Sequence, residues 1–160
     1  YYLNQFIYIM NNYVFIFDLD DTIIFHRNDI HYQYIFKNYE LSHYLNNIKY
    51  PKYIFTNGTR SHAEEVLKKM DIYDHFNKIY ARDTINDMKP NANAYIKVNN
   101  DIMLNHPNHR ILFLDDNIDN INASLNINWY PIYINQMDNI SYSNIKKYNT
   151  IIDFLKNFKQ

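Results

Sequence analysis

The sequence contains no cysteine and only one glycine, and both scarcities restrict what the chain can be. Without cysteine, a disulfide scaffold, a thiolate zinc site and a cysteine nucleophile are excluded. The absence also suits a reducing compartment, so we expect a cytoplasmic protein. The single glycine, Gly58, draws attention to its position, because glycine permits positive φ and a close backbone approach to a ligand.

An excess of charge of one sign and long apolar runs are lacking too. Lysine and arginine number 16 against 17 aspartate and glutamate, which gives a formal net charge of −1. That balance offers no electrostatic reason to expect a nucleic-acid or membrane partner. No apolar run approaches the roughly 20 residues that a membrane helix needs.

What is present suits one α/β domain over residues 1–160, with residues 1–9 as an N-terminal extension. Hydrophobic residues make up 47% of the chain, and 17 of them are tyrosines whose hydroxyls must reach water or a partner. Short β-prone runs occupy 13–17, 53–55, 78–81, 110–114 and 129–134. Helical patterns separate them at 40–48, 61–70, 91–105, 118–126 and 150–158, the second with Ser61 as N-cap in a capping box with Glu64. This alternation predicts a doubly wound, mostly parallel sheet.

Polar residues follow three of the predicted strands. The first strand leads into Asp18-Leu19-Asp20-Asp21-Thr22, the second into Thr56-Asn57-Gly58, and the fourth into Asp115-Asp116. A single aspartate at such a place is often only a turn or helix-cap residue. Three such strand ends meet at one edge of a parallel sheet, where ligands bind. Clustered carboxylates repel one another, and Mg²⁺, which prefers hard oxygen ligands, resolves the conflict.

Lys89, just before Pro90 and a predicted helix, adds a cation that can reach an anion at this edge. Taken alone, it would be read as an ordinary surface lysine.

In this order the residues resemble the four motifs of the haloacid dehalogenase (HAD) superfamily. The resemblance covers about residues 13–134 and implies a Rossmann-like core with a Mg²⁺-dependent hydrolase site. Asp18 matches the nucleophile that forms an aspartyl-phosphate. Asp20 matches the general acid/base, whose main-chain carbonyl also ligates Mg²⁺. Dehalogenases of the superfamily lack this second aspartate, which favours a phosphatase.

The remaining motifs carry further implied roles. Thr56 matches the hydroxyl that binds the phosphoryl oxygens, helped by the amide of Asn57 and by the turn at Gly58. Lys89 matches the cation that steadies both nucleophile and phosphoryl group. Asp116 aligns with the metal-binding acid, and its neighbour Asp115 acts on the metal directly or through water.

The segment between the first two motifs is short. Once a helix over 40–48 is allowed for, residues 23–39 remain for the squiggle and flap that border the active site in this superfamily. A helical cap domain does not fit there, so the chain is similar to capless members such as the magnesium-dependent phosphatases. The run from Phe55 to His62 is also similar to the pyrimidine 5′-nucleotidase branch, whose members carry a cap.

The resemblance therefore implies a phosphoric monoester hydrolase that acts on a small molecule or on a phosphate of a macromolecule. One alternative is a nucleotidase specific for nucleoside 5′-monophosphates. Another is a catalytically idle binding or regulatory module. A homo-oligomer is compatible with each, and substrate selection is assigned by position to His26, Arg27, His31 and Tyr32.

Overall fold

The structure, a computed structural model, describes residues 12–25, 35–138 and 143–158. The extension expected at residues 1–9 and most of the flap segment lie outside the described residues. The four positions assigned to substrate selection, between residues 26 and 32, lie outside them as well.

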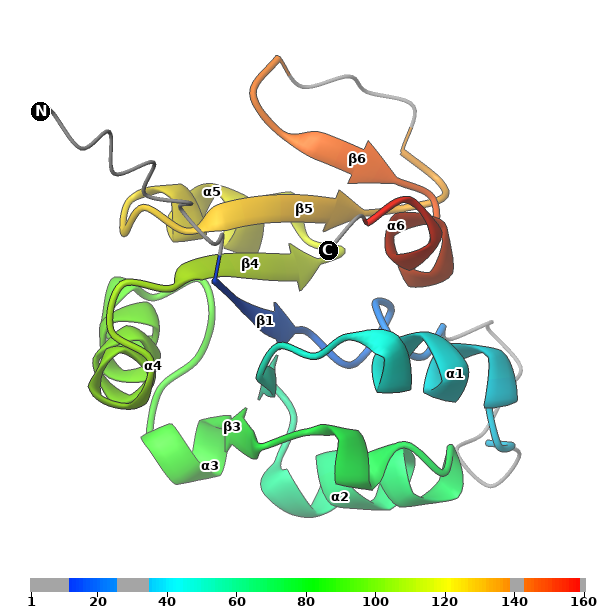
Figure 1. The fold of residues 1–160 in the computed structure, drawn as a ribbon. Helices are drawn as coiled ribbons and strands as arrows, with labels where there is room; N and C mark the ends of the chain where they lie inside the picture. The colour runs from blue at the N-terminus through cyan, green and yellow to red at the C-terminus, as the bar shows by residue number, and fades with distance from the viewer. Residues whose placement is uncertain (1–11, 26–34, 139–142, 159–160) are drawn as a thin grey trace, which may run out of the picture.

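A parallel sheet forms the centre of the molecule (Figure 1). The described strands are ordered β3-β2-β1-β4-β5-β6, and every neighbouring pair runs parallel. Their bounds are β1 (Tyr13–Phe17), β2 (Lys52–Thr56), β3 (Lys78–Ala81), β4 (Arg110–Asp115), β5 (Tyr130–Ile134) and β6 (Lys146–Tyr148). The predicted doubly wound α/β sheet is confirmed, and β1, which carries the first motif, lies between β2 and β4.

Helices cover both faces of this sheet (Figure 1). The face against α1 (Tyr39–Asn47), α2 (Arg60–Lys69) and α6 (Ile151–Asn157) forms one apolar cluster, and the face against α4 (Ala92–Asn105) and α5 (Ile118–Leu125) forms a second. Strand β1 serves both clusters by alternation, with Phe15 and Phe17 in the first and Val14 and Ile16 in the second. A strand buried on both faces accounts for the uninterrupted apolar run in the sequence. No described helix is long and apolar enough to cross a membrane.

Helix α2 begins earlier than the sequence pattern predicts. Its N-cap is Thr59, whose hydroxyl accepts the backbone N–H of His62, so the prediction of Ser61 as N-cap was wrong. With Thr59 as N-cap, the N3 position is His62, so Glu64 lies outside a capping box; it pairs with Arg60 at 2.7 Å, one turn away. The short elements β6, α3 (Arg82–Ile85) and the 3₁₀ turn η2 (Tyr73–His75) were not predicted, since three or four residues show no periodicity.

The tight turns use asparagine and aspartate where other proteins use glycine. Among the described residues, positive φ occurs at Asp21, Asp71, Asn86, Asn108 and Asn128. Gly58 does not have positive φ, so the conformational reason for its presence fails and a steric one remains. A Cβ at this position would lie 3.0 Å from the His62 ring and 3.2 Å from the Thr56 hydroxyl.

The left-handed turn at Asn108 gives a direct test of this substitution of asparagine for glycine. Asn108→Gly should keep or raise the free energy of unfolding, because glycine accepts φ of 66° without a Cβ clash. Asn108→Ala should lower it by about 1 kcal/mol, since alanine pays the left-handed penalty with no polar side chain to offset it. Urea unfolding of the two variants measures the difference, and equal stabilities would contradict the account.

Candidate active site

Asp18 lies directly beyond β1, at the carboxyl edge of the sheet. Its backbone N–H donates to the carbonyl of Leu114 on β4, which carries the parallel pairing one residue past the strand. Its side chain is buried. Thr22, in the turn that follows, donates its hydroxyl to Asp18 Oδ2 at 3.2 Å and lies 3.5 Å from Asp116 Oδ1. The turn therefore folds back over the end of its own strand and ties β1 to β4.

Lys89 lies between two of the carboxylates. Its Nζ is 2.6 Å from Asp18 Oδ1 and 2.6 Å from Asp115 Oδ2, and its side chain is 1% exposed. The rings of Phe55 and Phe113 lie beneath the ammonium group, with centroids 5.2 Å and 5.5 Å away. The two carboxylates and the two aromatic rings all interact favourably with the ammonium charge. These contacts hold in the interior a lysine that the sequence alone suggests is at the surface.

The backbone of Lys89 is fixed from the end of β2. The side chain of Asn57 donates to the carbonyl of Lys89 at 2.9 Å and accepts its N–H at 2.8 Å. This paired hydrogen bond joins the loop before α4 to the second strand end. Asn57 was predicted for the phosphate site, and the structure shows its side chain engaged in placing the lysine.

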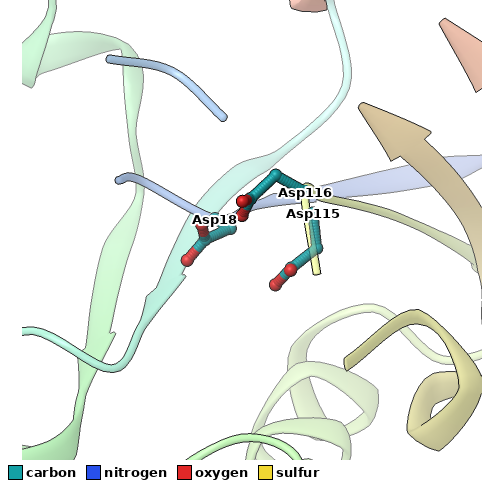
Figure 2. A group of neighbouring side chains, drawn as sticks. All are labelled: Asp18, Asp115 and Asp116. Carbon is teal, nitrogen blue, oxygen red and sulfur yellow. The ribbon is translucent and has the colours of Figure 1, made fainter. Parts of the chain in front are cut away.

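Asp115, the last residue of β4, and Asp116, directly after it, point in different directions (Figure 2). Asp115 is fully buried and accepts hydrogen bonds from Lys89, from the backbone of Asn117 and from the side chain of Asn120. Asp116 points toward Asp18 (Figure 2). One carboxylate oxygen from each of the three aspartates lies within 4.8 Å of the others.

This cluster carries more negative charge than the protein neutralises. Burial, reinforced by the charges of Asp115 and Asp116, raises the pKa of Asp18 to about 8 even though Lys89 opposes the shift. Burial and the charge of Asp115 likewise raise the pKa of Asp116 to about 6. Three carboxylates share one ammonium group, and all available donors are hard oxygens. This set suits Mg²⁺, whose two charges would balance the excess.

Asp20 and Thr56 approach the same place from β1 and β2. The carboxylate of Asp20 is 3.0 Å from Nε2 of His62, which lies in the first turn of α2. Both Asp20 Oδ2 and the Thr56 hydroxyl lie close to Gly58, at 3.6 Å and 3.2 Å from the point that its Cβ would occupy. The missing side chain thus leaves the two polar groups and the histidine room to meet.

The structure brings together the residues that the sequence nominated, and it adds three that were given no role. Thr22 bridges the carboxylates, His62 contacts Asp20, and Asn120 holds Asp115. The signals were weak: Thr22 ended a recognised motif, while His62 and Asn120 stood one turn into helices that follow strand ends.

Comparison with protein families identifies the same superfamily that the sequence motifs resemble. The profile of the haloacid dehalogenase-like hydrolases matches residues 26–134, more than half of the chain. The chain belongs to the haloacid dehalogenase-like hydrolase family. The matched range begins after Asp18, so the place of the first motif in this HAD site rests on the structure and the residues themselves. Comparison with curated proteins gives no significant match.

Solved structures share the HAD fold at low identity. The core domain of a putative phosphoglycolate phosphatase from Streptococcus pneumoniae is 18% identical, with a TM-score of 0.62 over 92% of this chain and 95% of that one. A HAD phosphatase from Thermococcus onnurineus is 18% identical, with a TM-score of 0.59 over 72% and 53%. The L-2-haloacid dehalogenase from Xanthobacter autotrophicus is 16% identical, with a TM-score of 0.56 over 68% and 44%. This chain spans about half the length of the last two proteins.

The buried lysine gives a prediction about stability in the absence of metal. Lys89→Met should lower the free energy of unfolding by about 3–5 kcal/mol at pH 7.5 in a chelator, because it leaves Asp18 and Asp115 buried without a cation. Urea unfolding measures the loss.

Two further variants test the cause of that loss. Lys69→Met, at a partly exposed lysine paired with Glu65, should change stability by no more than about 0.5 kcal/mol. Adding Asp115→Asn to Lys89→Met should recover part of the loss, because one orphaned charge disappears. A double variant no more stable than Lys89→Met would contradict the charge argument.

Proposed function

We propose that the chain is a Mg²⁺-dependent phosphatase that hydrolyses phosphomonoesters through an aspartyl-phosphate on Asp18. The observation that carries this is the position of Asp18, where one oxygen is bound by Lys89 and the other lies beside Thr22 and the Asp116 carboxylate. A nucleophile that must approach an anionic phosphate needs positive charge beside it, and Lys89 supplies it here. An idle binding module would have no need of a buried carboxylate held against a buried lysine.

Asp20 favours a phosphoester over a carbon–halogen bond. The family includes enzymes of both kinds, and halide leaves as a stable anion without a proton. An alkoxide leaving group is strongly basic and needs a general acid. Asp20, in contact with His62 and near the Thr56 hydroxyl, supplies a carboxyl group at the carboxyl edge of the sheet, where the phosphate would bind.

The reaction on this geometry has two steps. In the first, Asp18 attacks phosphorus, the P–O bond to the alcohol breaks, and Asp20 gives its proton to the departing oxygen. In the second, Asp20 takes a proton from water, whose oxygen attacks the phosphorus, and the bond to Asp18 breaks to release inorganic phosphate. Lys89 holds Asp18 in place throughout, and Thr56 donates a hydrogen bond to the phosphoryl oxygens.

The residues fit a bound Mg²⁺ with divided labour. Side chains of Asp18 and Asp116 and the main-chain carbonyl of Asp20 are the proposed ligands. Asp115 is proposed as the support of Lys89, because its lone pairs are taken by protein donors. When bound, the ion neutralises phosphoryl oxygen charge and lowers the pKa of the nucleophile.

Asp18→Asn should lower phosphate release from 4-nitrophenyl phosphate by about 10³-fold or more, since an amide is not a nucleophile for this step. The assay is Mg²⁺-dependent release of inorganic phosphate, with circular dichroism to verify folding. Asp74→Asn, at an exposed aspartate of η2, is the matched control and should keep full activity. Activity of Asp18→Asn within tenfold of the unchanged protein would overturn the assignment.

The different roles proposed for Asp115 and Asp116 predict that their asparagine variants rank in opposite order in two measurements, Mg²⁺ affinity and stability. Asp116→Asn should weaken Mg²⁺ binding at least about tenfold, because it removes a charged ligand. It should also stabilise the metal-free fold at pH 7.5. Because the pKa of Asp116 is raised to about 6 in the folded state, its ionised carboxylate lowers the free energy of unfolding at higher pH.

Compared with Asp116→Asn, Asp115→Asn should lower the free energy of unfolding more and the Mg²⁺ affinity less, because it removes the partner of Lys89. Calorimetric Mg²⁺ titration and urea unfolding in chelator give the two rankings. If Asp115→Asn loses more Mg²⁺ affinity than Asp116→Asn, the proposed ligand roles must be exchanged.

A further inference from the structure

Two cavities are each lined by a residue of the candidate site, and they differ in chemistry. One, of about 530 Å³, is bordered by Asp21, Asp116, Phe25, Ile134 and Met137 among others. The second, of about 520 Å³, is bordered by Lys89 and Arg82 among others. Both volumes fall in the range of small-molecule sites. Because Asp116 belongs to the wall of the first cavity, a group attached to a phosphate at Asp18 can reach it directly.

The wall of the first cavity presents apolar side chains to solvent. Met137 is 88% exposed and Phe25 is 38% exposed. Among its described lining residues there is no lysine, arginine or histidine, while two aspartates are present. Asn135, Gln136 and Thr150 line it as well. A carboxylate or second phosphate on the substrate would be repelled by Asp21, whereas an apolar group would be accepted against Phe25 and Met137.

Met137 is held in this exposed place by a hydrogen-bonded turn. Asn135, directly after β5, accepts the N–H groups of Met137 and Asp138, each at 2.9 Å, and donates to the main-chain carbonyl of Asp116 at 3.2 Å. Tyr133 donates its hydroxyl to Asp138 Oδ2 at 3.0 Å. The backbone at Met137 is therefore fixed relative to the proposed metal ligand, and the side chain projects from this fixed turn.

We propose that this cavity binds the leaving group of the substrate, and that the substrates are monophosphates of uncharged, apolar alcohols of about the size of an aromatic ring. The inference rests on the proposed phosphatase function and adds its substrate class. The ring lies against Phe25 and Met137 while the phosphate occupies the site at Asp18. Phosphorylated carboxylic acids are poorer substrates because their second negative charge would face Asp21, and sugar phosphates and nucleoside monophosphates are poorer because they bring less apolar area to Phe25 and Met137.

Binding is tested without turnover by phosphonates, whose C–P bond the proposed reaction does not break. Calorimetry with Mg²⁺ present compares 3-phenylpropylphosphonate, methylphosphonate and 4-phosphonobutyrate. The phenylpropyl compound should bind at least about tenfold more tightly than methylphosphonate, and the carboxylate compound no more tightly than methylphosphonate. Equal affinities, or a preference for the carboxylate, would overturn the proposal.

Variants locate the preference in the cavity. Met137→Ala should weaken phenylpropylphosphonate about fivefold and leave methylphosphonate unchanged, and Met137→Lys should reverse the discrimination against 4-phosphonobutyrate. Leu104→Ala, which removes a side chain of nearly equal exposure (84%) from the end of α4, is the control and should change neither. A Met137→Ala variant that weakens all three ligands equally would show a general structural effect and overturn the assignment.

Turnover separates this inference from the proposed function. The values of kcat/KM for 2-phenylethyl phosphate, glycerol 3-phosphate, 3-phosphoglycerate and uridine 5′-monophosphate compare esters of similar primary alcohols. The phenylethyl ester should lead by at least about tenfold, and Met137→Ala should act on it mainly through KM. A lead for the uridine compound would overturn the apolar cavity in favour of a nucleotidase. Selective phosphonate binding with no hydrolysis of any ester would instead overturn the phosphatase and leave the cavity standing.

Discussion

The ion pair of Lys89 with Asp18 and Asp115 is the interaction on which the site depends. Parallel pairing of β1 with β4, in the register of Phe17 with Leu114, brings the next residue of each strand to one place. Two buried carboxylates there would repel each other and lose their hydration, so the arrangement requires a buried cation. The ends of three strands contribute to it: β1 and β4 carry the carboxylates, and β2 carries the asparagine that fixes the lysine.

That cation also joins the polar edge to the aromatic core beneath it. Lys89 lies over Phe55 and Phe113, whose rings pack with those of Tyr95 and Trp129 at centroid distances of 5.3 to 6.4 Å. Tyr95 donates its hydroxyl to the main-chain carbonyl of Asn120, and the side chain of the same asparagine holds Asp115. Packing between α4, α5 and the sheet therefore fixes the charge pattern above it, and a cavity there would loosen the site.

Sequence reasoning predicted five of the six described strands, and the polar residues that follow three of them, because both come from local rules. An apolar run of five residues followed by carboxylates sets its own place at the sheet edge, and Asp18 and Asp115 were found in this way. The split between Asp115 and Asp116 was not predictable, since it depends on which side of β4 each side chain leaves. His62, Asn120 and the turn at Asn135 were missed for a related reason: their partners lie on other elements, at separations that no sequence pattern reveals.

The surplus of negative charge decides the state of the proposed nucleophile. Burial and the neighbouring carboxylates raise the pKa of Asp18, so without a divalent cation the cluster takes up a proton more readily than an ordinary aspartate, and a protonated carboxyl does not attack phosphorus. A cation held by Asp18 and Asp116 would favour the ionised form of both, so on this proposal metal binding would also activate the nucleophile. The arrangement also protects the fold, because a proton can take the place of the metal and spare the interior an uncompensated charge.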